Sequence, residues 1–183
     1  DQCPSKRESA FRSFYIQTDQ EWDECLLMCQ SDREKAALYA LRANAKNSIA
    51  AEAMEKIYEL DPANENLELL LVKEIRELEQ DLLGAQFNNK TKQNLQFHNL
   101  PRKKAGDYLV ALKKFVLKCM DENKVAHPEL WQLADGYMEY LAGDLYAAEK
   151  TFNLLKQKLK NKALREQLDV FILAHKINSY DEI

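Results

Sequence analysis

The sequence predicts that the chain folds entirely from α-helices. Only 4 Gly and 4 Pro occur among its 183 residues, whereas a β-sandwich or an α/β domain of this length needs more turn-forming residues. Apolar residues recur at helical spacing along most of the chain. The hydrophobic fraction of 46% and the charged fraction of 31% are typical of a folded domain and exclude wholesale disorder. We therefore expect one all-α domain over residues 1–183 with about nine helices.

The first four helices are expected to form two neighbouring pairs. They span about 4–16, 19–30, 32–45 and 48–60. Thr18 and Glu21 form a capping box before the second helix, because the hydroxyl and the carboxylate can each bond the other residue's backbone amide. Asn47 is the expected N-cap of the fourth helix. Pro62 ends that helix, because proline lacks a backbone N–H and disfavours helical geometry in the residue before it.

Five further helices are expected in the rest of the chain, with one long loop among them. They span about 64–83, 104–122, 129–142, 144–160 and 162–177. The stretch 86–103 is polar, Asn-rich and without helical period; loops of this length are uncommon inside a compact domain and are usually either functional or mobile. Gly143 and Asp144 mark a tight turn. The 162–177 helix is expected to be a terminal capping helix, apolar on its inner face and polar outside.

The expected helices group into four antiparallel pairs, over about 4–30, 31–62, 64–122 and 128–160. In the second pair, small or apolar residues and a proline occupy the key positions of a 34-residue helical hairpin. These are Leu38, Leu41, Ala50, Met54, Ile57 and Pro62. The fourth pair carries a similar set: Gly143-Asp144-Leu145, Ala148, Phe152 and Leu155.

On these residues the chain resembles a divergent tetratricopeptide-repeat protein. It departs from the family pattern in the long 86–103 loop of its third pair and in Lys160, which stands where a proline is expected. The resemblance implies a right-handed superhelical stack of antiparallel helix pairs. The alternative is an irregular helical bundle. Divergent arrays of this kind are also similar to some secreted and periplasmic bacterial proteins without a catalytic site, which slightly favours such a compartment over the cytoplasm.

The resemblance implies a protein or peptide partner bound on a concave face, lined by the first helix of each pair. The candidate partner-binding residues are those pointing away from the predicted core stripes: Lys35, Tyr39, Arg42, Trp131, Asp135 and Glu139. Trp131 is the foremost candidate, because aromatic side chains often anchor interfaces; packing against the 162–177 helix is the other interpretation. The predicted function is a non-enzymatic binding module, and the alternative is a structural scaffold segment of a larger chain.

The residue patterns do not support an enzyme, a cofactor or a nucleic-acid partner. The sequence contains neither a His-Glu-x-x-His motif nor a Gly-rich phosphate loop. A net charge of −4 argues against a general nucleic-acid binder. There is also no apolar run of about 18 residues, so no membrane span is expected. The acidic residues Glu74, Glu77, Glu79 and Asp81 alternate with basic ones and are expected to form a solvated helix face.

The four cysteines suggest one disulfide or none. Cys25 and Cys29 lie one helical turn apart and cannot reach disulfide geometry within a helix. A metal site there would need two further ligands, and no candidate stands at ligand spacing. If the 4–16 and 19–30 helices form a hairpin, Cys3 lies beside Cys29. We therefore expect a Cys3–Cys29 disulfide in an oxidising compartment, with Cys25 and Cys119 as core thiols.

Overall fold

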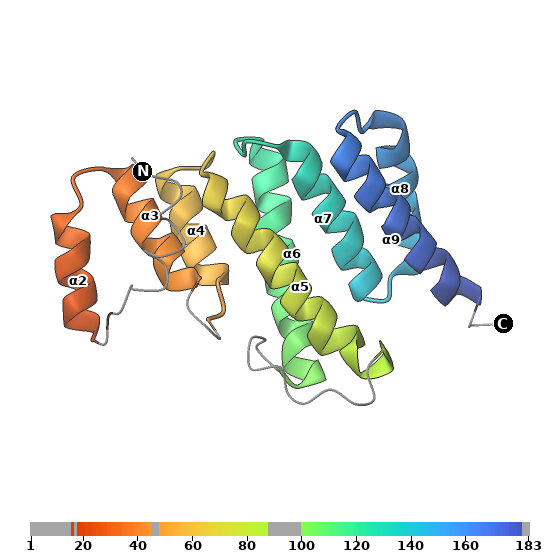
Figure 1. The fold of residues 1–183 in the computed structure, drawn as a ribbon, viewed down its shortest axis with the longest axis horizontal. Helices are drawn as coiled ribbons and strands as arrows, with labels where there is room; N and C mark the ends of the chain where they lie inside the picture. Colours follow the sequence, from red (N-terminus) through yellow and green to blue (C-terminus); the bar gives the residue numbers. More distant parts are fainter. Residues whose placement is uncertain (1–15, 17, 45–47, 88–99, 181–183) are drawn as a thin grey trace.

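A computed structural model describes residues 16, 18–44, 48–87 and 100–180 of the chain (Figure 1). Within these ranges the chain forms eight α-helices and no strand, which confirms the all-α prediction. They are α2 (Asp19–Met28), α3 (Asp32–Ala43), α4 (Ala51–Leu60), α5 (Glu65–Phe87), α6 (Arg102–Glu122), α7 (Pro128–Leu141), α8 (Leu145–Lys158) and α9 (Lys162–Tyr180). The helix expected over 4–16 lies outside the described residues.

Most helix ends fall within three residues of their expected positions, and two differences have a physical cause. The capping box of α2 is present: Thr18 Oγ1 accepts from the Glu21 amide, and the Glu21 carboxylate accepts from the Thr18 amide. The N-cap of α4 is Ala50, without a side-chain hydrogen bond. The expected cap, Asn47, lies outside the described residues. α5 was expected to end at Gly84 but continues through it to Phe87, because a glycine costs a helix only about 1 kcal/mol relative to alanine and does not exclude it.

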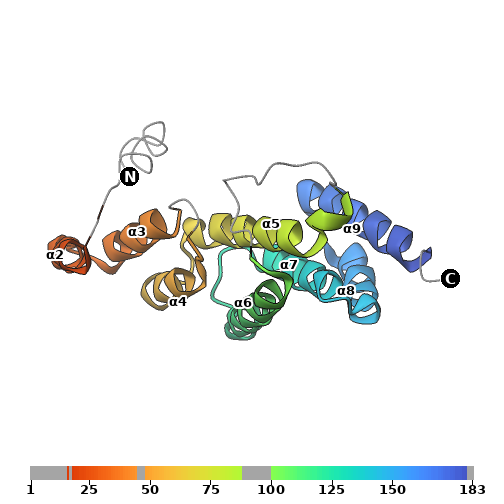
Figure 2. The ribbon, with the colours of Figure 1, turned by 90° about the horizontal axis from the view of Figure 1, so that it is seen from below.

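The helices pack as two layers of consecutive pairs. Within pairs, α3 packs on α4, α5 on α6 and α7 on α8. Between pairs, α3, α5, α7 and α9 contact one another in succession, and α4 contacts α6. Figure 2 shows α3, α5 and α9 on one side of the array and α4, α6 and α8 on the other. The result is an elongated array with α2 and α9 at opposite ends (Figure 1).

One continuous apolar core runs through the array from α3 to α9. The apolar stripe of α6, made of residues at helical spacing, is buried throughout: Ala105, Tyr108, Leu109, Leu112, Val116 and Cys119. Phe115 adds to it and joins three units. Its ring lies 5.9 Å from Tyr58 of α4 and 5.9 Å from Trp131 of α7, with the rings edge to face in both pairs. Such aromatic pairs add to the stability gained from burial alone.

The α7–α8 turn forms where Gly143 and Asp144 predict it. Gly143 has a φ of 82°, a left-handed conformation that glycine adopts without strain. The Asp144 amide donates to the Glu139 carbonyl, and the Gly143 amide donates to the Tyr140 carbonyl, which is the Schellman arrangement. Asp144 then caps α8 by accepting from the Ala147 amide at 3.0 Å. This turn brings α8 back antiparallel to α7.

Two expectations about helix faces are wrong. Glu74 is fully buried and Glu77 is 5% exposed, so the acidic residues of α5 do not form a solvated face. The hydroxyl of Tyr108 donates to Glu74 Oε2 at 2.5 Å, and Lys73 Nζ lies 3.4 Å from Glu74 Oε1. These contacts, on a helix covered from several sides, compensate for the burial of this carboxylate. The outer face of α9 is not polar throughout either, because it carries exposed apolar side chains in its last turns.

Candidate functional site

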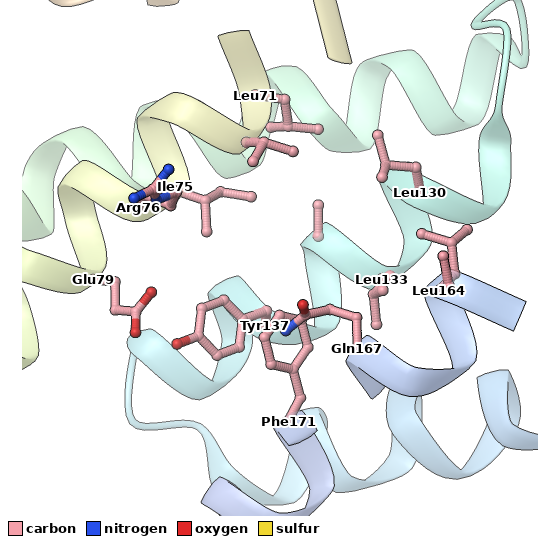
Figure 3. Close-up of a pocket in the computed structure, with 13 residues that line it drawn as sticks. Leu71, Ile75, Arg76, Glu79, Leu130, Leu133, Tyr137, Leu164, Gln167 and Phe171 are labelled. Carbon is pink, nitrogen blue, oxygen red and sulfur yellow. The ribbon is translucent and has the colours of Figure 1, made fainter. Parts of the chain in front are cut away.

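A pocket of about 470 Å³ opens between α5, α7 and α9 (Figure 3). We call it the α5–α7–α9 groove. Most of its wall is apolar, with a few polar side chains among the lining. The lining residues are Leu71, Val72, Ile75, Arg76, Glu79, Leu130, Leu133, Ala134, Tyr137, Ala163, Leu164, Gln167 and Phe171. Pockets of this size and character are the usual form of binding sites in proteins.

Each of the three helices contributes one face to the groove. The residues from each helix recur at spacings of three or four, so they lie on the same side of it. The floor is rigid, because Leu71 is fully buried and Leu133 and Ala134 are almost so. Val72 lies at the edge and is 46% exposed. The groove is therefore a surface feature with walls built from the core.

Tyr137 and Glu79 form the polar end of the floor. The Tyr137 ring is stacked on Phe171 of α9, with ring centres 3.9 Å apart and planes inclined by 12°. Its hydroxyl is directed towards the Glu79 carboxylate (Figure 3). Burial, followed by the negative charge of Glu79, raises the pKa of Tyr137 above its ordinary value. The hydroxyl is therefore protonated at neutral pH and is available as a donor.

Arg76 gives the groove a free positive charge. Its side chain is exposed and lines the same pocket, as Figure 3 shows. In the part of the chain that the structure describes, Arg76 forms no ion pair. A guanidinium in this position can bind a carboxylate with two parallel hydrogen bonds. Gln167 on α9 adds an exposed side-chain amide that can both donate and accept.

Trp131, Asp135 and Glu139 do not line the groove. Trp131 is fully buried and packs edge to face on Phe115 of α6, so it does not lie on the exposed surface where the sequence pattern placed it. α7 contacts α5, α6, α8 and α9, so neighbouring helices cover the side of α7 on which Trp131 lies.

Asp135 and Glu139 instead form a polar cluster with Lys113 of α6. Lys113 Nζ lies 3.3 Å from Asp135 Oδ1 and 3.1 Å from Glu139 Oε1. Thr151 of α8 donates to Glu139 Oε2 at 2.8 Å. Burial raises the pKa of Asp135, and the positive charge of Lys113 opposes this shift. Asp135 is 7% exposed, so the cluster holds α6, α7 and α8 together and leaves this carboxylate closed to a partner.

The predicted residues of α3 lie at the far end of the array, around Trp22 of α2. Tyr39 is half-buried, with its ring 5.2 Å from Trp22. The Arg42 guanidinium lies 4.6 Å from the centre of the same ring, and Lys35 forms a surface ion pair with Asp32 at 3.6 Å. The structure therefore separates the six predicted residues into two groups and brings neither group to the groove.

The apolar pattern of the sequence predicts most of the groove residues to be core residues. Leu71, Ile75, Leu130, Leu133 and Tyr137 follow the apolar period of their helices, and a period alone cannot separate a core residue from the floor of a pocket. One feature of the sequence does indicate a groove. The helix at 64–83 carries apolar residues on more than one side, and such a helix has neighbours on several sides between which a groove can form.

The cysteines of the described part are free thiols. These are Cys25, Cys29 and Cys119. Cys29 Sγ donates to the Cys25 carbonyl at 3.4 Å. Cys3 lies outside the described residues, so its pairing with Cys29 in an oxidising compartment stays a prediction. Among the described residues, no group of three or more His, Cys, Asp or Glu side chains is placed to hold a metal ion.

The described helices also lack a segment that is both long and apolar enough to cross a membrane. Comparison of the chain with models of protein families, with curated proteins and with solved structures finds no match. The function of the protein therefore has to be inferred from its own residues.

Proposed function

We propose that the protein is a non-enzymatic binding module that takes an apolar segment of a protein or peptide into the α5–α7–α9 groove. The observation that carries this proposal is the groove itself. Its floor is made of buried apolar side chains, and its edge offers an unpaired guanidinium and a side-chain amide. An apolar pocket with a few polar groups at its edge is a usual form of a ligand-binding site, and no catalytic step is included in the proposal.

The helix order supports a tetratricopeptide-like architecture for this module. The groove is lined by α5, α7 and α9, which are the first helices of consecutive units, and such helices line the concave face of a helical-repeat array. Ala148 and Phe152 of α8 are buried against α7. Gly136 of α7 lies where a Cβ atom would be 2.8 Å from Thr151 Cγ2 and 3.0 Å from Phe152 Cε1. A small residue at that crossing and an Ala-x-x-x-Phe sequence in the second helix belong to the repeat pattern.

The groove also indicates the chemistry of the bound segment. Its volume of about 470 Å³ accommodates a small number of aliphatic or aromatic side chains. An acidic side chain or a terminal carboxylate near Arg76 would form a charge-assisted hydrogen bond. Glu79 disfavours a second acidic group on the same side. The expected ligand is a short segment with clustered apolar residues and one carboxylate beside them.

One feature favours the alternative, a structural scaffold segment without a ligand groove of its own. Val170, Leu173 and Ile177 of α9 are exposed apolar residues at the end of the array. Exposed apolar ends are expected where one unit of a scaffold stacks on another. In that case peptides would not bind at the groove, so one experiment separates the two functions.

The experiment is selection from a displayed library of random peptides of about 12 residues, with binding measured by fluorescence anisotropy. Val72→Glu places a charge at the groove edge without disturbing the core, because Val72 is 46% exposed. The matched control is Val110→Glu on α6, where the valine is 70% exposed and outside the groove. We expect Val72→Glu to weaken binding by about 2 kcal/mol, roughly thirtyfold, and Val110→Glu to leave it unchanged.

Arg76→Glu tests the predicted charge of the ligand. Selected peptides that carry an acidic residue should lose affinity for this variant, and peptides with that residue replaced by lysine should regain it. Selection that enriches no sequence pattern, or equal affinities of the Val72 and Val110 variants, would contradict the groove as the binding site.

A further inference from the structure

The last turns of α9 carry an apolar stripe on the side turned away from the protein. Val170, Leu173 and Ile177 are 58%, 59% and 56% exposed. Their spacing of three and four residues places them along one line on the helix. The opposite side of α9 holds the buried residues Leu168 and His175. The C-terminal half of α9 therefore has one buried face and, opposite to it, an exposed apolar face, and a helix with apolar residues on its outer side usually has a neighbour there.

The repeat pattern indicates that another helix covers this stripe. Val170 and Leu173 lie 34 residues after Gly136 and Glu139 of α7, one period of the array. In α7 both positions face the second helix of the pair. Gly136 lies against Thr151 and Phe152 of α8, and Glu139 accepts a hydrogen bond from Thr151. Within the part of the chain that the structure describes, no helix packs on the equivalent side of α9.

The charges beside the stripe are self-complementary. Asp169 lies four residues before Leu173 and Lys176 three residues after it, and both lie on the same flank of the stripe. Both side chains are exposed, and neither forms an ion pair within the described ranges. If two copies of α9 lie antiparallel with their Leu173 residues in contact, Asp169 of each copy falls beside Lys176 of the other. The two-fold symmetry makes this contact occur twice.

We propose that the protein forms a homodimer in which α9 of one copy packs antiparallel on α9 of a second copy. Val170, Leu173 and Ile177 form the apolar seam, and Asp169 and Lys176 set its register. The stripe and the groove use different sides of α9, because Leu164, Gln167 and Phe171 line the groove. Dimerisation therefore leaves the groove open and does not depend on what binds there.

The interface is small, so the dimer is expected to be in exchange with the monomer. Three apolar side chains from each copy place it at the low end of specific interfaces. A dissociation constant in the micromolar range or weaker follows from this size. Sedimentation equilibrium of the wild-type chain over roughly 1 μM to 1 mM covers that range. We expect the mass to rise from that of a monomer towards that of a dimer, and a constant monomer mass over the whole series would overturn the proposal.

Leu173→Glu tests the seam, and Leu154→Glu is its matched control. Leu154 is a leucine of α8 that is 50% exposed, so the same change is made at similar exposure away from the stripe. Circular dichroism should show both variants to be as helical as the wild type, because neither position is in the core. We expect Leu173→Glu to abolish dimerisation and Leu154→Glu to preserve it. A dimer that survives Leu173→Glu would show that another surface forms it.

Charge reversal tests the antiparallel register. Asp169→Lys or Lys176→Asp alone places like charges together at two symmetric contacts, which should weaken the homodimer roughly tenfold. A mixture of the two single variants restores opposite charges, and a chain carrying both changes does so by itself. We therefore expect the mixture to form a heterodimer and the doubly changed chain to dimerise like the wild type. Equal weakening in all four samples would rule out this register.

Discussion

The chemistry of Cys119 is strongly altered by its surroundings. It is fully buried in α6, and this burial raises the pKa of its thiol to about 12. The reactive thiolate form is therefore scarce at neutral pH. Cys25 is only half-buried and provides an internal comparison in the same chain.

Alkylation of the reduced native protein should label Cys25 and leave Cys119 unlabelled. Iodoacetamide treatment followed by peptide mapping measures both sites at once, and labelling in urea should modify the two cysteines equally. Rapid labelling of Cys119 in the native protein would mean that α6 opens far more readily than a core helix should. Labelling without prior reduction also tests the Cys3–Cys29 disulfide, since four reactive thiols in urea would contradict it.

At the residue scale, sequence patterns predict which side chains are buried more accurately than they predict which neighbours those side chains contact. The stripe of α6 is buried as expected, because apolar residues at helical spacing have one low-energy side to pack. Trp131 was placed on a binding surface because its helix was assumed to have a solvated side. Four neighbouring helices remove that side, and their number is a property of the tertiary packing. Glu74 was misassigned for the same reason.

At the element scale, the close approach of α7 and α8 depends on Gly136. A methyl group at this position would lie 2.8 Å from Thr151 Cγ2, and a β-branched side chain has little freedom to move aside. Gly106, within α6, has no atom within 4 Å of an added Cβ. Gly136 and Gly106 therefore separate the effect of contact from the effect of helix propensity.

In Gly136→Ala, the close contact with α8 should destabilise the protein by about 1–3 kcal/mol. The higher helix propensity of alanine should offset up to roughly 1 kcal/mol of this loss. Gly106→Ala should stabilise it by about 0.5–1 kcal/mol, because alanine loses less backbone entropy than glycine when a helix forms. Urea unfolding followed by circular dichroism measures both changes. A stabilised Gly136→Ala variant would show that α7 and α8 lie farther apart than described.

Helix identity and order were predictable from the sequence, and the helix ends depended on local signals. Thr18, Pro62 and Gly143 each mark an end through backbone chemistry that acts within a few residues. Two local signals were misleading: Asn47 was expected to cap the helix that in fact begins after Ala50, and Gly84 was expected to end α5, which continues to Phe87. The α5–α7–α9 groove could not be predicted in this way, because it depends on the distance between helices that are far apart in the sequence.

At the scale of the whole molecule, Phe115 connects three successive helix pairs in the middle of the array. Its ring contacts Tyr58 of α4 on one side and Trp131 of α7 on the other. In a stacked array, stability is the sum of the units and the contacts between neighbours, so a weakened central contact uncouples the ends. Phe115→Ala should cost about 3–5 kcal/mol.

Hydrogen exchange measured by mass spectrometry should then show α3–α4 and α7–α8 opening at different denaturant concentrations, where the wild type opens them together. Val110→Ala on the same helix is the control, because an exposed side chain should change stability by no more than about 0.5 kcal/mol. Uniform loss of protection along the Phe115→Ala chain would mean that the array behaves as one cooperative unit despite the lost contact.

The groove has walls on three helices that touch in succession, α5 on α7 and α7 on α9. The width of the groove therefore depends on the curvature of the array, because a change in curvature moves α5 and α9 relative to each other. A segment wedged between Ile75 and Leu164 would hold that curvature fixed and stiffen the molecule along its length. Conversely, tension applied between α2 and α9 would flatten the array and change the affinity of the groove without touching any residue that lines it.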